Sequence, residues 1–326
     1  TVLLNGIHLI KKRCHIKMDQ PRYPYYYLFV TKDHIIEDFE KLSTMKLKKE
    51  NKNDLLSMIY SKKEILFYVK ITDYFSEKCR VKCRFAKNSS PLDYFEQNYN
   101  RLERLDFEDY WDFNEYIDKK NRGCNNFVSL VALEVYRYFK PKTILDFSAG
   151  WGDRLIGALA YGRAEYTGVD PSVCMRPRYK EIINFFTTYC PEIAGSKEKY
   201  KVIKKPFEDY RPRVGHYDLV FTSPPFFDYE IYEKGNKTQS VDRYPSVEIW
   251  KQNFMFPALE KSLLALKVGG HLALYIEDYK GHQYVGAVKK RMKDLENNKF
   301  IGCINWVNTD RSKLKSRNTY VWEKTE

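Results

Sequence analysis

A short glycine-bearing segment stands where the first of several parallel strands is predicted to end. The segment, Asp146 to Gly152 (DFSAGWG), follows the strand-like run TILDF and precedes a helical pattern. Glycines at such a turn let the backbone approach a ligand, and open α/β sheets bind ligands beyond the carboxyl ends of their strands. We therefore expect a ligand here. Its expected contacts in this loop are Asp146, Phe147, Ser148, Ala149, Gly150 and Gly152.

Two further acidic positions follow the next two predicted strands. Asp170 comes 24 residues after Asp146, with Pro171 beside it, and its carboxylate can accept both hydroxyls of a ribose. Glu208 or Asp209 ends the third strand, where the amino group of an adenine would lie. Three such groups at successive strand ends predict nucleoside binding.

The first loop is not the G-x-G-x-x-G of dinucleotide-binding proteins, and it begins with an aspartate that would repel a pyrophosphate. A cationic ligand suits Asp146 better. An amino acid ammonium and a methyl sulfonium are such cations, so the pattern favours S-adenosylmethionine over a nicotinamide dinucleotide.

A proline pair follows the fourth predicted strand, YDLVF, in the run Thr222 to Asp228 (TSPPFFD). The prolines fix the backbone and remove two amide donors, so carbonyl oxygens remain available as acceptors. If Ser223 Oγ and the Pro224 carbonyl accept the hydrogens of an aromatic amine, the nitrogen is drawn toward tetrahedral geometry and its lone pair becomes nucleophilic. Phe226 would then stack on the base. Proline pairs also simply end strands, but this pair lies 77 residues after Asp146 in a complete cofactor pattern.

These motifs resemble the S-adenosylmethionine-dependent amino-methyltransferases that modify adenine N6 or cytosine N4, whose signature is Asp, Asn or Ser, then Pro-Pro, then an aromatic. DFSAGWGDRL with TSPPFFD is also similar to the DNA methylases of large phages and giant viruses. The resemblance covers residues 120 to 325. It implies a seven-stranded Rossmann-like domain, a catalytic tetrapeptide Ser223, Pro224, Pro225 and Phe226, and extrusion of the target base from a duplex. Serine at the first catalytic position is commoner among cytosine N4 enzymes, so the target base stays open.

Other site residues are expected from their positions beside these motifs. Phe127, with Asn126 and Ser129, precedes the cofactor loop where the family places a segment touching the methionine end of the cofactor; a helix cap and core face is the alternative. The polar loop from residue 228 to 245 can fold over the base. The substrate contacts expected from these regions are Phe227, Tyr229, Tyr232, Arg311 and Lys313, the last two on a basic loop with Lys315 and Arg317 that solvation explains equally well.

Competing hypotheses remain. The acceptor can be DNA, which we favour, or RNA. A protein methyltransferase acting on a glutamine amide needs similar chemistry, although the basic N-terminal part argues against it. A non-catalytic subunit that binds nucleic acid for a partner is a third alternative, against which the intact glycine loop, Asp170 and Ser223 argue.

From Thr143 onward, predicted strands alternate with predicted helices, and these elements must position the residues named above. Predicted strands at 143–147, 165–170, 200–205, 217–223 and 271–277 are separated by helices at 153–160, 178–189 and 247–266, a rhythm typical of a parallel sheet covered on both faces. The tail from Ile304 predicts an antiparallel hairpin at the sheet edge. Residues 89–140 predict leading helices. The fold class is thus α/β, with residues 89–326 as the methyltransferase domain.

Residues 1–88 predict a smaller α+β module, with strands at 2–10, 25–30, 65–71 and 79–85 and a helix at 33–42. They carry +9 of the chain's net charge of +13, which favours a polyanionic partner, so the module is a candidate for nucleic-acid recognition. A solvated lysine-rich surface is the alternative.

Composition sets the remaining expectations. With 43% hydrophobic and 30% charged residues among 326, the chain predicts a globular protein. We expect no membrane insertion and find no leader-like pattern, although what precedes Thr1 stays open. Seven scattered cysteines favour a reducing intracellular compartment, with Cys79 and Cys83 as strand thiols rather than metal ligands. We expect no metal, and the oligomeric state stays open.

Overall fold

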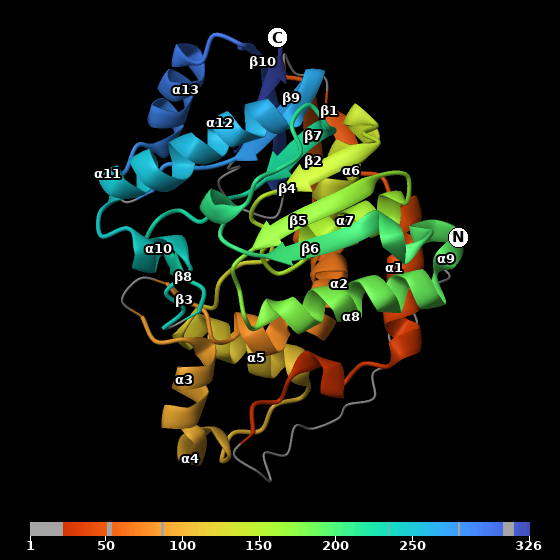
Figure 1. Ribbon diagram of the computed structural model, residues 1–326. Helices are drawn as coiled ribbons and strands as arrows, with labels where there is room; N and C mark the ends of the chain where they lie inside the picture. Colours follow the sequence, from red (N-terminus) through yellow and green to blue (C-terminus); the bar gives the residue numbers. More distant parts are fainter. Residues whose placement is uncertain (1–21, 51–53, 86–87, 234, 280, 309–315) are drawn as a thin grey trace.

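One nine-stranded sheet organises the molecule in the computed structural model, which describes residues 22–50, 54–85, 88–233, 235–279, 281–308 and 316–326 (Figure 1). Listed across the sheet, its strands are β1 (Lys48–Glu50), β2 (Leu56–Tyr60), β10 (Asn298–Asn308), β11 (Ser316–Lys324), β9 (Leu266–Tyr275), β7 (Tyr217–Thr222), β4 (Thr143–Asp146), β5 (Glu165–Asp170) and β6 (Tyr200–Lys204). A second, two-stranded sheet pairs β3 (Arg84–Phe85) with β8 (Glu230–Ile231).

The strand directions confirm the predicted Rossmann-like α/β class. Strands β6, β5, β4, β7 and β9 are parallel, and β11 runs antiparallel to both β9 and β10. From β4 the chain proceeds outward to β5 and β6, then returns to β7 on the other side of β4. The order therefore reverses between β4 and β7, which is where open α/β sheets bind their ligands.

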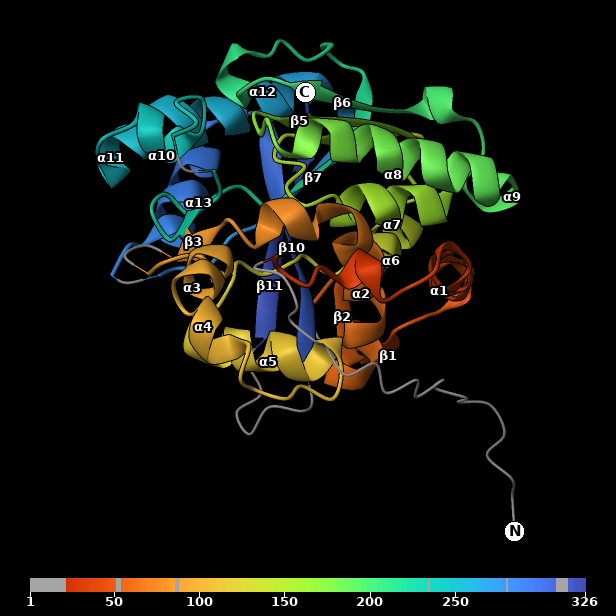
Figure 2. The same ribbon diagram turned by 90° about the horizontal axis from the view of Figure 1, so that it is seen from below.

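Helices cover both faces of this sheet (Figure 2). On one face lie α1 (Lys32–Thr44), α2 (Lys62–Arg80), α6 (Ser129–Phe139), α7 (Asp153–Tyr161) and α8 (Met175–Tyr189). On the other lie α11 (Val247–Trp250), a π-helical turn at Lys251–Met255, α12 (Phe256–Ala265) and α13 (Tyr284–Asp294). The shorter helices are α3 (Pro91–Gln97), α4 (Tyr99–Leu102), α5 (Tyr110–Lys120), α9 (Pro191–Ala194) and α10 (Ser240–Arg243), with 3-10 turns at Tyr26–Leu28, Lys197–Lys199 and Phe207–Asp209.

The central parallel strands β4 and β7 are apolar on both sides because each side faces a helical layer. Ile144 and Leu219 belong to the hydrophobic cluster under α6 and α7, whereas Leu145 and Val220 belong to the cluster under α12. Successive side chains of a strand point to opposite faces, so neighbouring residues enter different cores. This is why these strands have continuous apolar sequences.

The structure differs from the prediction in the N-terminal part. Residues 65–71 and most of 79–85 were expected as strands but belong to helix α2 and the turn after it, and residues 25–30 hold only a 3-10 turn. Isoleucine, phenylalanine and tyrosine favour strands by type, yet Ile71, Phe75 and Cys79 are buried at the four-residue spacing of one helix face. The expected strand at 2–10 lies outside the described residues.

Residues 22–85 share a sheet and a core with the rest of the chain. Strand β2 pairs in parallel with β10, so the β10–β11 hairpin is not the edge of the sheet as expected. Phe39 of α1 stacks on Phe186 of α8 with ring centroids 4.0 Å apart. The described part of the expected N-terminal module thus has no core of its own.

No helix among the described residues is long and apolar enough to cross a membrane.

Candidate active site

A cavity of about 370 Å³ lies at the carboxyl ends of the central strands. It is lined by the loop after β4, the residues after β5, the turn after β6 and the turn after β7. Of the predicted site residues that the structure describes, those lining it are Phe127, Phe147, Ser148, Ala149, Gly150, Asp170, Pro171, Glu208, Ser223, Pro224, Pro225, Phe226, Phe227, Tyr229 and Tyr232. The cavity therefore brings the predicted cofactor and catalytic motifs together.

The loop after β4 needs its two glycines. Gly150 has φ 58° and Gly152, which precedes α7, has φ 98°, a region that side chains rarely adopt. A Cβ on Gly152 would also lie 2.9 Å from Ile182 Cδ1 of α8. The loop is thus held close against α8, and the backbone of Gly150 faces the cavity without a side chain.

Asp170 is fixed at the end of β5 by backbone donors. Its carboxylate accepts from the N–H groups of Gly150 and Ser172, each at 2.9 Å. Burial raises the pKa of Asp170 to about 6, although these two donors act in the opposite direction. Tyr179 of α8 donates to the Gly150 carbonyl at 2.5 Å, which holds the loop and the carboxylate in one arrangement.

The structure places Asp146 behind the cavity rather than in it. Asp146 is fully buried and does not line the cavity; Arg154 Nε donates to its Oδ2 at 2.8 Å, and Tyr166 and Thr222 donate to it as well, at 2.7 and 2.9 Å. Its charge is therefore matched by Arg154. The prediction that Asp146 faces a ligand cation is wrong, because Arg154, eight residues further on in α7, already forms an ion pair with its carboxylate. Gly152 likewise shapes the loop without lining the cavity.

Arg154 was missed by the sequence analysis. Its guanidinium donates to the Ser148 carbonyl and lies 5.2 Å from the centre of the Phe127 ring, and the residue lines the cavity. Phe127 in turn makes edge contacts with Tyr275 and Trp306. Arg154 lies within the DFSAGWGDRL run, but the sequence gives it no role, since its role depends on the packing of α7 against β4.

The end of β6 resolves one open alternative. Arg243 pairs with both carboxylates, at 3.4 Å from Glu208 and 3.1 Å from Asp209, but only Glu208 lines the cavity, where it also accepts from Tyr244 Oη at 2.8 Å. Phe207 stacks on Phe147 with ring centroids 4.7 Å apart, forming an apolar wall beside Glu208. Glu208 is thus the carboxylate placed to meet a ligand.

The Ser223-Pro224-Pro225-Phe226 turn after β7 forms another part of the cavity wall. The Phe226 ring lies nearly parallel to Tyr229, 6.4 Å between centroids and 10° between planes, and the Phe226 carbonyl accepts from the Tyr229 N–H at 3.0 Å. The next residue, Phe227, adopts φ 48°, which is rare for a residue with a side chain. Such backbone outliers cluster at functional sites.

Beyond Phe226 the cavity is aromatic and charged. Tyr275 and Trp306 lie 5.1 Å apart between centroids, and Glu277 and Arg317 complete this end. Arg317 belongs to strand β11 rather than to the basic loop. The predicted contacts Arg311 and Lys313, with Lys315, lie outside the described residues.

Three buried polar atoms on lining residues have no hydrogen-bond partner among the described residues: Trp151 Nε1, Gln239 Oε1 and Trp306 Nε1. Trp306 is 2% exposed and Gln239 is 7% exposed. Buried polar groups are normally paired. Each of these atoms exposes less than 1 Å² of surface, so they lie within the walls of the cavity rather than on its open face.

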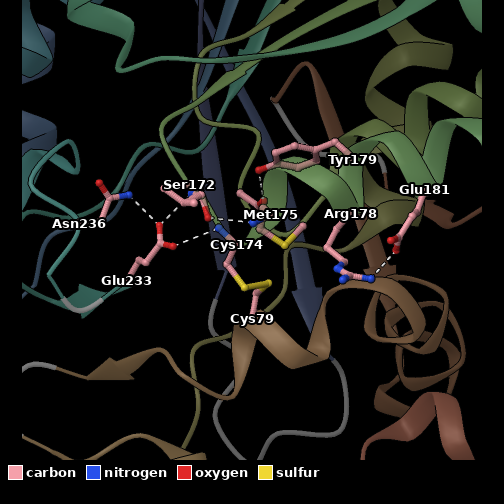
Figure 3. The surroundings of a disulfide bond; sticks show 11 residues. Cys79, Ser172, Cys174, Met175, Arg178, Tyr179, Glu181, Glu233 and Asn236 are labelled. Atoms are coloured by element: carbon pink, nitrogen blue, oxygen red, sulfur yellow. Dashed lines mark hydrogen bonds and ion pairs between the residues drawn. A yellow bond between two sulfur atoms is a disulfide. The ribbon is translucent and has the colours of Figure 1, made fainter.

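The polar loop after the catalytic turn closes one side of the cavity. Glu233 accepts from the N–H groups of Val173 and Cys174, each at 3.0 Å, just before α8, and Asn236 Nδ2 donates to Glu233 at 2.7 Å (Figure 3). The ring of Tyr232 lies 5.5 Å from that of Trp151. The loop thus rests on the segment that follows Asp170.

Two disulfides join the N-terminal part to segments that border this cavity. Cys79 of α2 is bonded to Cys174, beside α8, as Figure 3 shows, and Cys83 is bonded to Cys124. The prediction of strand thiols is wrong for both Cys79 and Cys83. Among the described residues no group of three metal-binding side chains occurs.

No family model matches the chain, and no curated protein matches it. Among solved structures, the chain is similar to TrmN from Thermus thermophilus, with 12% identity over 61% of this chain and 49% of that one and a TM-score of 0.39. It is also similar to an SAM-dependent O-methyltransferase from Thermotoga maritima (12% identity, 65% and 71%, TM-score 0.38) and to the tRNA methyltransferase TrmI from Aquifex aeolicus (12%, 62% and 71%, 0.38). The chain spans about half the length of TrmN. With similarities this distant, the fold class rests on the strand order of the sheet itself.

Proposed function

We propose that this protein transfers a methyl group from S-adenosylmethionine to an exocyclic amino group of a base in nucleic acid, most readily DNA, at adenine N6 or cytosine N4. One observation carries the proposal: the Ser223-Pro224-Pro225-Phe226 turn, the glycine loop and Asp170 all line one cavity. Neither motif alone would specify amine chemistry.

The lining residues fit the proposed cofactor. Asp170 presents a buried carboxylate to ribose hydroxyls, and the glycine loop offers backbone without side chains. Phe147 and Phe207 form an apolar wall for an adenine, with Glu208 beside them as acceptor for its amino group. When bound, the cofactor supplies a methyl group on a sulfonium. The residues of the chain bind and orient the reactants.

The acceptor amine belongs beside Ser223. Its hydroxyl and the Pro224 carbonyl accept the two amine hydrogens, so the nitrogen lone pair is directed toward the cofactor half of the cavity. Ser223 is neutral and is not a strong base, so the amine proton leaves during or after attack. Phe226 supplies a face on which the base stacks, a contribution of about 1–3 kcal/mol per base.

The aromatic lining beside Phe226 supports a planar heteroaromatic acceptor, because Tyr275 lies 6.1 Å from Phe226 and 5.1 Å from Trp306 between ring centroids. A base inside a duplex cannot reach a cavity of this kind, and the proposal therefore includes extrusion of the target nucleotide.

The experiment is methylation of mixed DNA and RNA with labelled S-adenosylmethionine, followed by nucleoside mass spectrometry. N6-methyladenine or N4-methylcytosine from the DNA is the expected product. Label found only in RNA would show that RNA, not DNA, is the acceptor. If peptides are added to the same reaction, label in their side-chain amides would overturn the nucleic-acid assignment. If the protein binds S-adenosylmethionine and nucleic acid but transfers no methyl group, it is a non-catalytic subunit.

A further inference from the structure

A second hollow, outside the cavity, has five cationic side chains around an apolar and aromatic floor. It measures about 530 Å³ and lies between α8 and the edge strand β6, which are neighbours in Figure 1. Its floor is formed by the buried side chains of Tyr179, Ile183 and Tyr200. Its charged lining consists of Arg176, Lys180, Lys197, Lys201 and Lys204, which we call the basic groove.

The charges of the basic groove are not neutralised within the described part of the chain. No acidic residue lines it, its five cations are exposed, and none of them forms an ion pair with another described residue. The contrast on the same helix is Arg178, whose guanidinium lies 2.5 Å from the Glu181 carboxylate, as Figure 3 shows. Five like charges around one hollow repel one another unless an anion joins them.

The basic groove begins beside the cavity. Met175 lines the cavity, and the next residue, Arg176, lines the groove. Lys204 pairs with Asp170 in the register of β5 and β6, at the same end of the sheet. Tyr179 forms part of the groove floor and also donates to Gly150 in the cofactor loop. A chain held in the groove would therefore run close to the reaction site.

We propose that the basic groove binds the phosphodiester backbone of the nucleic acid that is methylated. The inference rests on the proposed function, because the bound polymer is the methyl acceptor. Cations spaced along a groove suit a polymer with one charge per nucleotide, and neutralising those charges releases condensed counterions. The floor offers no exposed aromatic face, so the groove contacts backbone rather than bases and carries no sequence preference.

Lysines on an edge strand have a second use, since they keep sheet edges from pairing with other molecules. Lys201 and Lys204 lie on β6, but Arg176 and Lys180 lie on α8 and face the same hollow. Protection of the edge alone would not require cations from the helix. The arrangement on both walls therefore favours a bound anion.

The test compares two triple variants that remove equal charge. Lys180→Gln/Lys201→Gln/Lys204→Gln neutralises the groove, and Lys41→Gln/Lys119→Gln/Lys251→Gln neutralises lysines that are already paired with carboxylates elsewhere. Binding of fluorescent 20-nucleotide DNA and RNA, single-stranded and duplex, is measured over a range of salt concentrations. We expect the groove variant to lose roughly 10- to 100-fold in affinity near 0.1 M salt, and its slope of log K against log salt to fall by about 2 to 3.

The control variant should keep the wild-type slope, and both should bind S-adenosylhomocysteine normally. An unchanged slope in the groove variant overturns the proposal, as does an equal loss in both variants. A groove variant that binds normally but precipitates assigns the lysines to edge protection and also overturns it. If the wild type binds nucleic acid through the groove yet methylates none, the proposed function fails while the groove assignment stands.

Discussion

At the residue scale, two aspartates that end neighbouring strands have different environments. Asp146 lies in the interior and is paired with Arg154, so it stabilises the loop, and removing one partner of such a buried pair typically costs about 3–5 kcal/mol. Asp170 meets backbone donors and lines the cavity. The sequence predicts both positions from the strand pattern. It does not reveal which carboxylate is already paired, because Arg154 reaches Asp146 only when α7 packs on the sheet.

The Ser223→Ala variant tests the proposed amine-binding turn. It removes one acceptor that matters most as the nitrogen becomes tetrahedral, so methyl transfer should fall roughly 100-fold or more while cofactor affinity stays near wild type. Single-turnover transfer and calorimetry with S-adenosylhomocysteine measure the two effects. Ser246→Ala, which removes a hydroxyl that caps α11 outside the cavity, is the control. A wild-type transfer rate in Ser223→Ala would show that the turn is not catalytic.

The raised pKa of Asp170 predicts a pH dependence of cofactor binding. Ribose hydroxyls donate to the charged carboxylate, so binding favours the ionised form, and a group with a pKa of about 6 is mostly protonated at pH 5. Affinity for S-adenosylhomocysteine should therefore fall about tenfold between pH 7.5 and pH 5. Asp170→Asn keeps the shape without the charge, so its affinity should be lower at pH 7.5 and nearly flat with pH. If wild type and variant show the same change of affinity with pH, Asp170 does not bind the cofactor. The pH dependence would then belong to another group such as Asp153, which also lines the cavity and whose pKa is raised by burial to about 7.

At the element scale, the parallel strands were predictable and helix α2 was not. Strands β4 and β7 are short apolar runs between helical patterns, and both faces of the sheet are covered there, so residue type and residue spacing predict the same structure. In α2 the residue types favour a strand while the buried positions follow a helix. Tertiary packing against α6, α7 and α8 decides the outcome. The tail hairpin was predicted, but its partner β2 was not, because a parallel pairing 248 residues apart, Leu56 with Ile304, leaves no local signal.

The Cys79–Cys174 bond ties α2 to α8 and is expected to stabilise both. It spans 95 residues, and the chain-entropy model assigns about 4–5 kcal/mol to a loop of that size. Cys79→Ser should therefore lower the free energy of unfolding measured under oxidising conditions. Cys303→Ser, which removes a cysteine that forms no disulfide, should not. Equal unfolding free energies for Cys79→Ser and wild type, with Cys79 and Cys174 both alkylated as free thiols in the denatured unreduced wild type, would show that the bond does not form in solution.

At the scale of the whole molecule, the structure differs from the sequence-based prediction in where the unpaired cations gather and in how the N-terminal part packs. The first 90 residues carry most of the net charge, which led to a separate basic module as the recognition element. The structure instead places β1, β2, α1 and α2 within the common sheet and core, and among the described residues it shows a cluster of five unpaired cations on α8, β6 and the turn before it. Net charge along the chain cannot show which cations pair locally, because pairing depends on the helix faces and strand edges that the fold brings together.

This integration predicts that residues 89–326 do not fold as an independent domain. Removing residues 22–88 would expose the β10 edge and take Phe39, Ile71 and Phe75 away from α7 and α8, leaving an apolar surface where a packed core stood. We expect that fragment to be aggregated or to melt without a cooperative transition, and to bind S-adenosylhomocysteine weakly if at all. The control chain starts at Arg22 and keeps every described element; it should melt cooperatively and bind the ligand. Circular dichroism on heating, size-exclusion chromatography and calorimetry compare the two chains. A monomeric 89–326 fragment with a cooperative melt and wild-type ligand affinity would show that the chain divides near residue 88 after all, and that α1, α2 and β2 form an accessory layer on a self-sufficient domain.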